Sequence, residues 1–242
     1  MEINADDFTQ NGLYLLVEGG RRIALTHEKI DAFARLFESN LDQIPAEIRK
    51  AVAFQACPVC PEKDRAKFCH ALPATLAFVD ELKGFRSYDQ VAAVYKGREP
   101  GLIFVPRTTM QEALQFVAIL SLMHHCEVGR QYERYFQGVH PLMQSGEMVD
   151  RIHLNVFWDC GGEPRKVAEV LSRFENEITC TCRCQVKRLA LVCKDEALIN
   201  AFVNTQVHIE LLAATGPSLL ARSFKDHQPG DRPAVNPTPG LG

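Results

Sequence analysis

Residues 13–25 read LYLLVEGGRRIAL, two apolar runs on either side of a pair of glycines. Glycines between apolar runs favour a tight reversal of the chain, so this stretch predicts a β-hairpin. Thr26 follows as a suitable N-cap, and Ile30, Phe33 and Phe37 continue at helical spacing. The chain is therefore expected to begin with a hairpin that leads into a helix.

Two more short apolar segments, residues 91–95 and 102–105, have the character of strands around a glycine-containing turn. Thr109 and Glu112 then stand at the spacing of a capping box, which predicts the start of another helix. Apolar residues recur at helical spacing from there to Met123. The N-terminal part should thus combine strands and helices.

The pattern changes to alternating strand-like and helix-like segments beyond residue 145. The expected elements are strands at residues 152–158 and 180–192 and helices at residues 167–178 and 198–212, the last ending at Gly216-Pro217. A helix between two strands implies a parallel pair with a right-handed crossover. This part is therefore expected to be a small β-α-β-α unit.

The predicted fold class is α+β or α/β, in two parts and a tail. Residues 1–145 form the N-terminal part, with a hairpin, helices and a cysteine-ligated metal loop, and residues 146–222 form the β-α-β-α part. Residues 223–242 hold four prolines and three glycines, which favours a disordered tail.

Composition narrows the classes of function. Hydrophobic residues make up 46% of the 242 residues and charged residues 24%, the balance of a globular protein. The net charge of -3 argues against a nucleic acid as the main partner, because phosphate-binding proteins are usually basic. The longest predominantly apolar run, Phe116 to Met123, is far shorter than the roughly 20 residues that a membrane span needs.

The first residues have neither a basic nor an apolar region of the secretory type, so a cytoplasmic location is expected. Disulfides rarely persist in that compartment. The chain nevertheless has nine cysteines. Thiols in such number suggest metal ligation, redox chemistry or use as small buried side chains.

The strongest chemical signal is Cys57-Pro58-Val59-Cys60. A C-x-x-C turn lets two thiolates converge on one tetrahedral ion at about 2.3 Å. Cys69 follows nine positions later in the same polar segment, and Cys126, at the expected end of a helix, could close the site by a tertiary contact. His70 is adjacent to Cys69. We therefore predict a metal site.

Three kinds of chemistry remain open for these thiols. Zinc is preferred because thiolate-rich tetrahedral sites suit it. An iron–sulfur cluster is the alternative, since four thiolates serve it too and Pro61 follows Cys60 as in cluster-binding loops. A thiol oxidoreductase acting through Cys57 and Cys60 is the third, and it would require a strand before the motif and a helix after it.

The order Cys57-Pro58-Val59-Cys60-Pro61, Cys69 and then Cys126 resembles a bacterial family known only as a domain of unknown function. The resemblance covers about residues 50–150 and includes segments such as residues 87–91 and 107–109. It implies that Cys126 is the fourth ligand. His125 and Glu127 replace the small residue and proline expected beside that cysteine, so His70 and His125 stay open as substitutes. The resemblance implies no activity.

Cys180, Cys182 and Cys184 suggest a second metal site at first sight. On a strand, however, residues two apart lie about 6.5 Å from each other. Thiolates on one tetrahedral ion must be near 3.7 Å, given metal–sulfur bonds of about 2.3 Å. These cysteines are therefore expected to be core residues of a half-buried strand.

No triad or carboxylate pair can be assembled from the order of residues alone, so no catalytic residue is predicted. The expected function is a non-catalytic, zinc-binding regulatory or interaction protein. Its partners should be proteins, with neither nucleic acid nor membrane involved. The sequence does not determine the oligomeric state.

Overall fold

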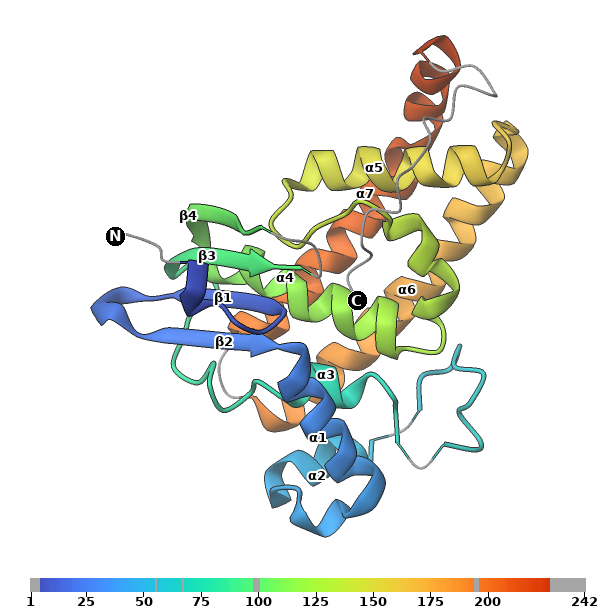
Figure 1. Cartoon of the computed structure of the whole chain (residues 1–242). Helices are drawn as coiled ribbons and strands as arrows, with labels where there is room; N and C mark the ends of the chain where they lie inside the picture. The colour runs from blue at the N-terminus through green and yellow to red at the C-terminus, as the bar shows by residue number, and fades with distance from the viewer. Residues whose placement is uncertain (1–4, 55, 67, 98–100, 194–195, 227–242) are drawn as a thin grey trace.

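A four-stranded antiparallel sheet and a set of helices make up the computed structural model, which describes residues 5–54, 56–66, 68–97, 101–193 and 196–226 (Figure 1). The strand order is β2-β1-β3-β4. The strands are β1 (Gly12–Leu16), β2 (Arg22–Thr26), β3 (Gln90–Lys96) and β4 (Ile103–Thr109). The predicted hairpin is confirmed as β1 and β2, and the two later segments complete the sheet, so the fold is mixed α+β.

The two faces of the sheet belong to apolar clusters of different size. Leu13, Leu15 and Leu25 lie on the face that belongs to the main core. On the opposite face, Tyr14 and Phe8 pack edge to face within a small separate cluster. One broad face therefore remains for the helices to cover, as expected for an antiparallel sheet.

The helices are α1 (His27–Ser39), α2 (Ala46–Val52), α3 (Leu72–Leu76), α4 (Met110–Leu120), α5 (Ser145–Asp159), α6 (Pro164–Val192) and α7 (Ala197–Asp226). Short 3-10 segments lie at η1 (Ala5–Asp7), η2 (Glu18–Gly20), η3 (Leu41–Gln43) and η5 (Gly129–Phe136). A π-helical turn, η4 (Ser121–His125), continues α4. Helix α4 packs between the sheet and α7 and is buried along most of its length, so it is the centre of the fold (Figure 1).

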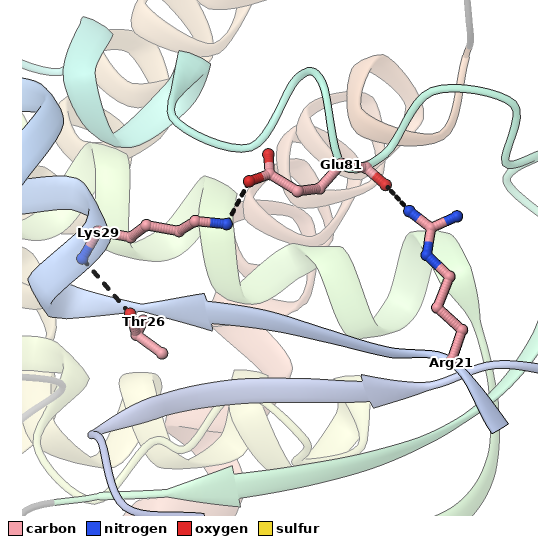
Figure 2. A network of polar contacts seen from close by, with 4 residues as sticks. All are labelled: Arg21, Thr26, Lys29 and Glu81. Atoms are coloured by element: carbon pink, nitrogen blue, oxygen red, sulfur yellow. Dashed lines mark hydrogen bonds and ion pairs between the residues drawn. The ribbon is translucent and has the colours of Figure 1, made fainter.

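Two helix starts follow the predicted local chemistry. Thr26 caps α1, since its Oγ1 accepts a hydrogen bond of 3.4 Å from the Lys29 backbone N–H. Figure 2 shows that the Lys29 side chain also pairs with Glu81, whose carbonyl accepts a 3.2 Å hydrogen bond from Arg21. These contacts tie the hairpin and α1 to the segment after α3. The capping box of Thr109 and Glu112 likewise opens α4.

The predicted β-α-β-α unit is wrong, because α5, α6 and α7 are helices. Residues 152–158, expected as a strand, belong to α5, whose buried residues Met148, Ile152 and Val156 recur every fourth position. Residues 180–192, also expected as a strand, belong to the 29-residue α6. A short apolar run suits a buried strand and a buried helix equally, and here the helical period decides which side chains reach the core.

The last helix is longer than predicted. The sequence suggests an end at Gly216-Pro217, but α7 continues to Asp226. Good helix formers follow the proline, among them Leu219, Leu220 and Ala221, and they favour continuation despite the missing N–H. The predicted disordered tail begins inside this helix at residue 223, and its remainder, residues 227–242, lies outside the described residues.

One main apolar core draws side chains from both sides of residue 145, including Leu13 and Phe116 before it and Phe157 and Phe202 after it. The division into two domains at that position stays a prediction. Within the described part of the chain, no helix combines the length and the apolar character that crossing a bilayer requires.

Candidate thiol site

The first half of the site is a loop between α2 and α3. The Cys60 N–H donates to the Cys57 carbonyl at 2.9 Å, which closes a turn with Pro58 at its second position. Further turns follow through residue 65, and the Leu72 N–H donates to the Cys69 carbonyl at 2.9 Å where α3 begins. The C-x-x-C turn is thus present as predicted.

The second half comes from the end of η4. Cys126 follows this π-helical turn, and its carbonyl accepts a 2.9 Å hydrogen bond from the Arg130 N–H. Gly129 makes the turn possible, because a Cβ there would lie 1.8 Å from the Leu122 carbonyl oxygen. The backbone crossing at Gly129 therefore holds Cys126 at 6% exposure beside the loop.

All four predicted cysteines line one pocket of about 120 Å³: Cys57, Cys60, Cys69 and Cys126. Thr181, Gln185 and Arg188 of α6 form another wall of it. The Gln185 amide donates to the Cys69 sulfur at 3.5 Å. Loop, η4 and α6 thus meet around sulfur atoms that come from distant parts of the chain.

Within this pocket, Cys60, Cys69 and Cys126 influence one another, and we call them the loop group. Burial, together with the smaller effects of the neighbouring Cys69 and Cys60, raises the pKa of Cys126 to about 11. Burial also raises the pKa of Cys60, and Cys69 adds to that effect. Cys60 and Cys126 therefore favour the protonated form unless a cation compensates their charge.

The remaining predicted ligand, Cys57, is directed toward α6. Its Sγ lies 3.7 Å from the Sγ of Cys180, 123 positions away in sequence. Its thiol also interacts with Cys184, one helical turn beyond Cys180. We call Cys57, Cys180 and Cys184 the helix group.

Within the helix group, the pKa values of Cys57 and Cys184 are shifted in opposite directions. A hydrogen bond to Cys184 and burial raise the pKa of Cys57. The same hydrogen bond, together with the positive charges of Arg188 and Lys187, outweighs burial and lowers the pKa of Cys184 to about 6. Arg188 is only 1% exposed and lies over the Phe54 ring at 5.5 Å, so its charge is held inside the site.

The prediction for Cys180, Cys182 and Cys184 as one face of a strand is wrong, because all three lie on α6. On a helix, Cys180 and Cys184 share a face toward Cys57, while Cys182 turns into the core with 0% exposure. The helix group was therefore not predicted from the sequence. The C-x-x-x-C spacing of Cys180 and Cys184, with Arg188 four positions further, was the available signal.

The two substitute ligands lie differently. His70 lines the pocket, with its Nδ1 3.3 Å from a Glu127 carboxylate oxygen. His125 does not line it. Burial lowers the pKa of His125, and the first charges that act on it are those of Asp31 and His27. His70 is thus the better placed of the two.

Every cysteine of the chain is a free thiol. The 3.7 Å between Cys57 and Cys180 equals the sulfur–sulfur spacing expected for two thiolates on one tetrahedral ion with bonds of about 2.3 Å. In the described residues, however, no group of three or more His, Cys, Asp or Glu side chains is arranged to hold a metal ion. A complete site would need the loop group and Cys57 to close together.

The surroundings of the C-x-x-C motif differ from what a thiol oxidoreductase would require. Helix α2 precedes the motif, and residues 61–65 after it form turns. A thiol oxidoreductase has a strand before the motif and a helix after it, and this arrangement activates the first thiol. Neither element is found in this described stretch.

Comparison with family models, with curated proteins and with solved structures finds no match to this chain. The resemblance to the bacterial family of unknown function therefore stays a prediction.

Proposed function

We propose that this protein is a non-catalytic regulatory or interaction protein whose pocket binds a thiophilic metal ion, zinc first, through Cys57, Cys60, Cys69 and Cys126. One observation carries the proposal: these four side chains line a single pocket of about 120 Å³, although they come from the loop and from the end of η4. Zinc prefers such sulfur-rich sites, and its binding would contribute directly to the folding free energy.

The polar wall of the pocket supports the proposal. Four thiolates around one divalent cation carry a net negative charge, which is costly to bury without a counter-charge. Arg188 is only 1% exposed to solvent, and it brings a positive charge to this same pocket. The Gln185 amide already donates to Cys69, as partners of ligating sulfurs do.

Elemental analysis of the chain purified under reducing conditions tests the proposal. We expect stoichiometric zinc, lost in Cys69→Ser and in Cys126→Ser and retained in the matched control Cys160→Ser, since Cys160 lies outside the pocket. Visible absorbance of anaerobically purified protein with bound iron would favour the cluster instead. Metal binding would be refuted altogether if the wild-type protein is metal-free and its melting temperature changes neither with added zinc nor with a chelator.

The regulatory part of the proposal involves a protein partner in a reducing compartment, where thiols persist. An exposed apolar stripe supports it: Val203, Val207 and Leu211, four positions apart on α7, are 42%, 44% and 48% exposed. Co-purification from its own cells, with and without zinc, would identify a partner whose binding depends on the metal.

A further inference from the structure

Cys57 and Cys180 form a close pair between a loop and a helix. Their sulfur atoms are 3.7 Å apart, and a disulfide needs about 2.05 Å. Cys180 is fixed within the 29-residue α6. Cys57 lies in a loop of turns, so a modest movement of the loop side can close the remaining gap.

The pair lies between two pockets. Cys180 lines a pocket of about 310 Å³ together with Arg183, Cys184 and Lys187. Pro58 lines that pocket too, whereas Cys57 lines the 120 Å³ pocket with the loop group. A small polar oxidant can thus reach Cys180 from one side, while Cys57 borders the proposed metal site on the other.

We infer that Cys57 and Cys180 are the two halves of a reversible disulfide switch that responds to hydrogen peroxide. The Cys180 sulfur, the more exposed of the two, attacks one peroxide oxygen and the O–O bond breaks, which yields a sulfenic acid and one water. The Cys57 sulfur then attacks the Cys180 sulfur, forms the S–S bond and expels a second water. The two sulfurs lose two electrons to the peroxide, and both thiol protons leave in the waters. A dithiol reductant reverses the reaction by exchange.

The switch has a consequence for the metal, and this part rests on the proposed function. Cys57 has two alternative partners: the loop group across the 120 Å³ pocket, and Cys180 on α6. A disulfide to Cys180 removes Cys57 from the ligand set. Oxidation should therefore release the ion, and reduction should restore binding.

Peptide mapping of the full chain tests the disulfide directly. The protein is treated with hydrogen peroxide, with and without prior removal of metal, blocked with N-ethylmaleimide and digested with trypsin. Cys57 falls in the peptide of residues 51–63 and Cys180 in the peptide of residues 174–183, while Arg183 separates Cys184 from Cys180. We expect these two peptides to be joined, with fragment ions that assign the bond to Cys57 and Cys180.

Two variants complete the test. Cys180→Ser should abolish the joined peptides and keep the metal during peroxide treatment, as followed with a zinc-sensitive dye. Cys160→Ser should behave like wild type. Alkylation of Cys57 and Cys180 after oxidation, or a bond from Cys57 to Cys60 or to Cys184, would overturn the switch even if zinc is bound. A Cys57–Cys180 bond in a chain that never binds metal would instead uphold the switch and refute the proposed function.

Discussion

The loop group and the helix group place the same side chain in two contrasting environments. In the loop group, burial raises the pKa of Cys126 to about 11. In the helix group, a hydrogen bond from Cys57 and the nearby Arg188 and Lys187 lower the pKa of Cys184 to about 6. Enclosed thiols suit a metal that supplies the missing positive charge, whereas the close pair of Cys57 and Cys180 beside a second pocket suits reaction with an oxidant. Cys57 connects the two environments.

Among the substitutions considered, Gly129→Ala should have the largest effect, and it should affect the loop group but not the helix group. A Cβ at this position meets the Leu122 carbonyl oxygen at 1.8 Å, so the turn that carries Cys126 must move. We expect a loss of about 1–3 kcal/mol in the free energy of unfolding, the usual cost of overpacking, and weaker zinc binding. Denaturant unfolding and a zinc titration measure both.

In the same variant, formation of the Cys57–Cys180 disulfide should be unaffected, because neither cysteine depends on the Gly129 turn. Gly146→Ala is the matched control, since a Cβ there meets nothing within 4 Å. Equal losses in both variants would show that the crossing at Gly129 does not position Cys126.

Arg188→Met tests whether one buried charge serves both groups. The guanidinium lines the pocket of the loop group and also lowers the pKa of Cys184. Methionine keeps much of the packing against Phe54 but removes the charge. Loss of a group that supports metal ligands typically costs 10–100-fold in affinity, about 1.4–2.7 kcal/mol. Zinc competition with a chromogenic chelator measures it, and unchanged affinity would mean that Arg188 has only a packing role.

Local sequence chemistry accounts for two predicted features, one in the site and one elsewhere in the fold. The turn at Cys57-Pro58-Val59-Cys60 and the cap at Thr26 each depend on a few neighbouring residues, and both are present. The pocket shared with Cys126 was also anticipated, although only as a tertiary contact. The turn and the cap can be predicted because their causes lie within a turn or two of chain.

The helix group could not be predicted, because its cause is tertiary. The alternation of Cys180, Cys182 and Cys184 fits a half-buried strand, and only packing shows that α6 buries Ile178, Gln185 and Arg188 at helical spacing. Arginine is rarely buried, so an arginine in the sequence does not indicate a core position. Because that segment was predicted as a strand and not as a helix, the approach of Cys57 to Cys180 could not be predicted from the sequence.

Thr109→Ala provides a reference that lies outside both groups. Thr109 caps α4 through a 3.4 Å hydrogen bond from the Glu112 N–H, and removal of such a cap costs about 1 kcal/mol. The free energy of unfolding should fall by this amount while zinc affinity and disulfide formation stay unchanged. A parallel loss of zinc affinity would mean that metal binding reports global stability, and the contrast between the groups would lose its meaning.

The smallest expected effect is a change in stability at acid pH that depends on Glu112, again at the start of α4. Burial alone would raise the pKa of Glu112, but hydrogen bonds from the Thr109 backbone, the Thr109 hydroxyl and the Thr108 hydroxyl outweigh it and hold the pKa below its ordinary value. A lowered folded-state pKa means that the stabilisation is complete above the unfolded-state value of 4.5 and disappears as the pH falls through the folded-state value. Melting curves of the metal-free chain should therefore show a smaller loss of stability below pH 4.5 in Glu112→Gln than in wild type. Glutamine still completes a capping box, so the two proteins should differ little once both are in acid. Parallel pH profiles would place the acid sensitivity elsewhere in the chain.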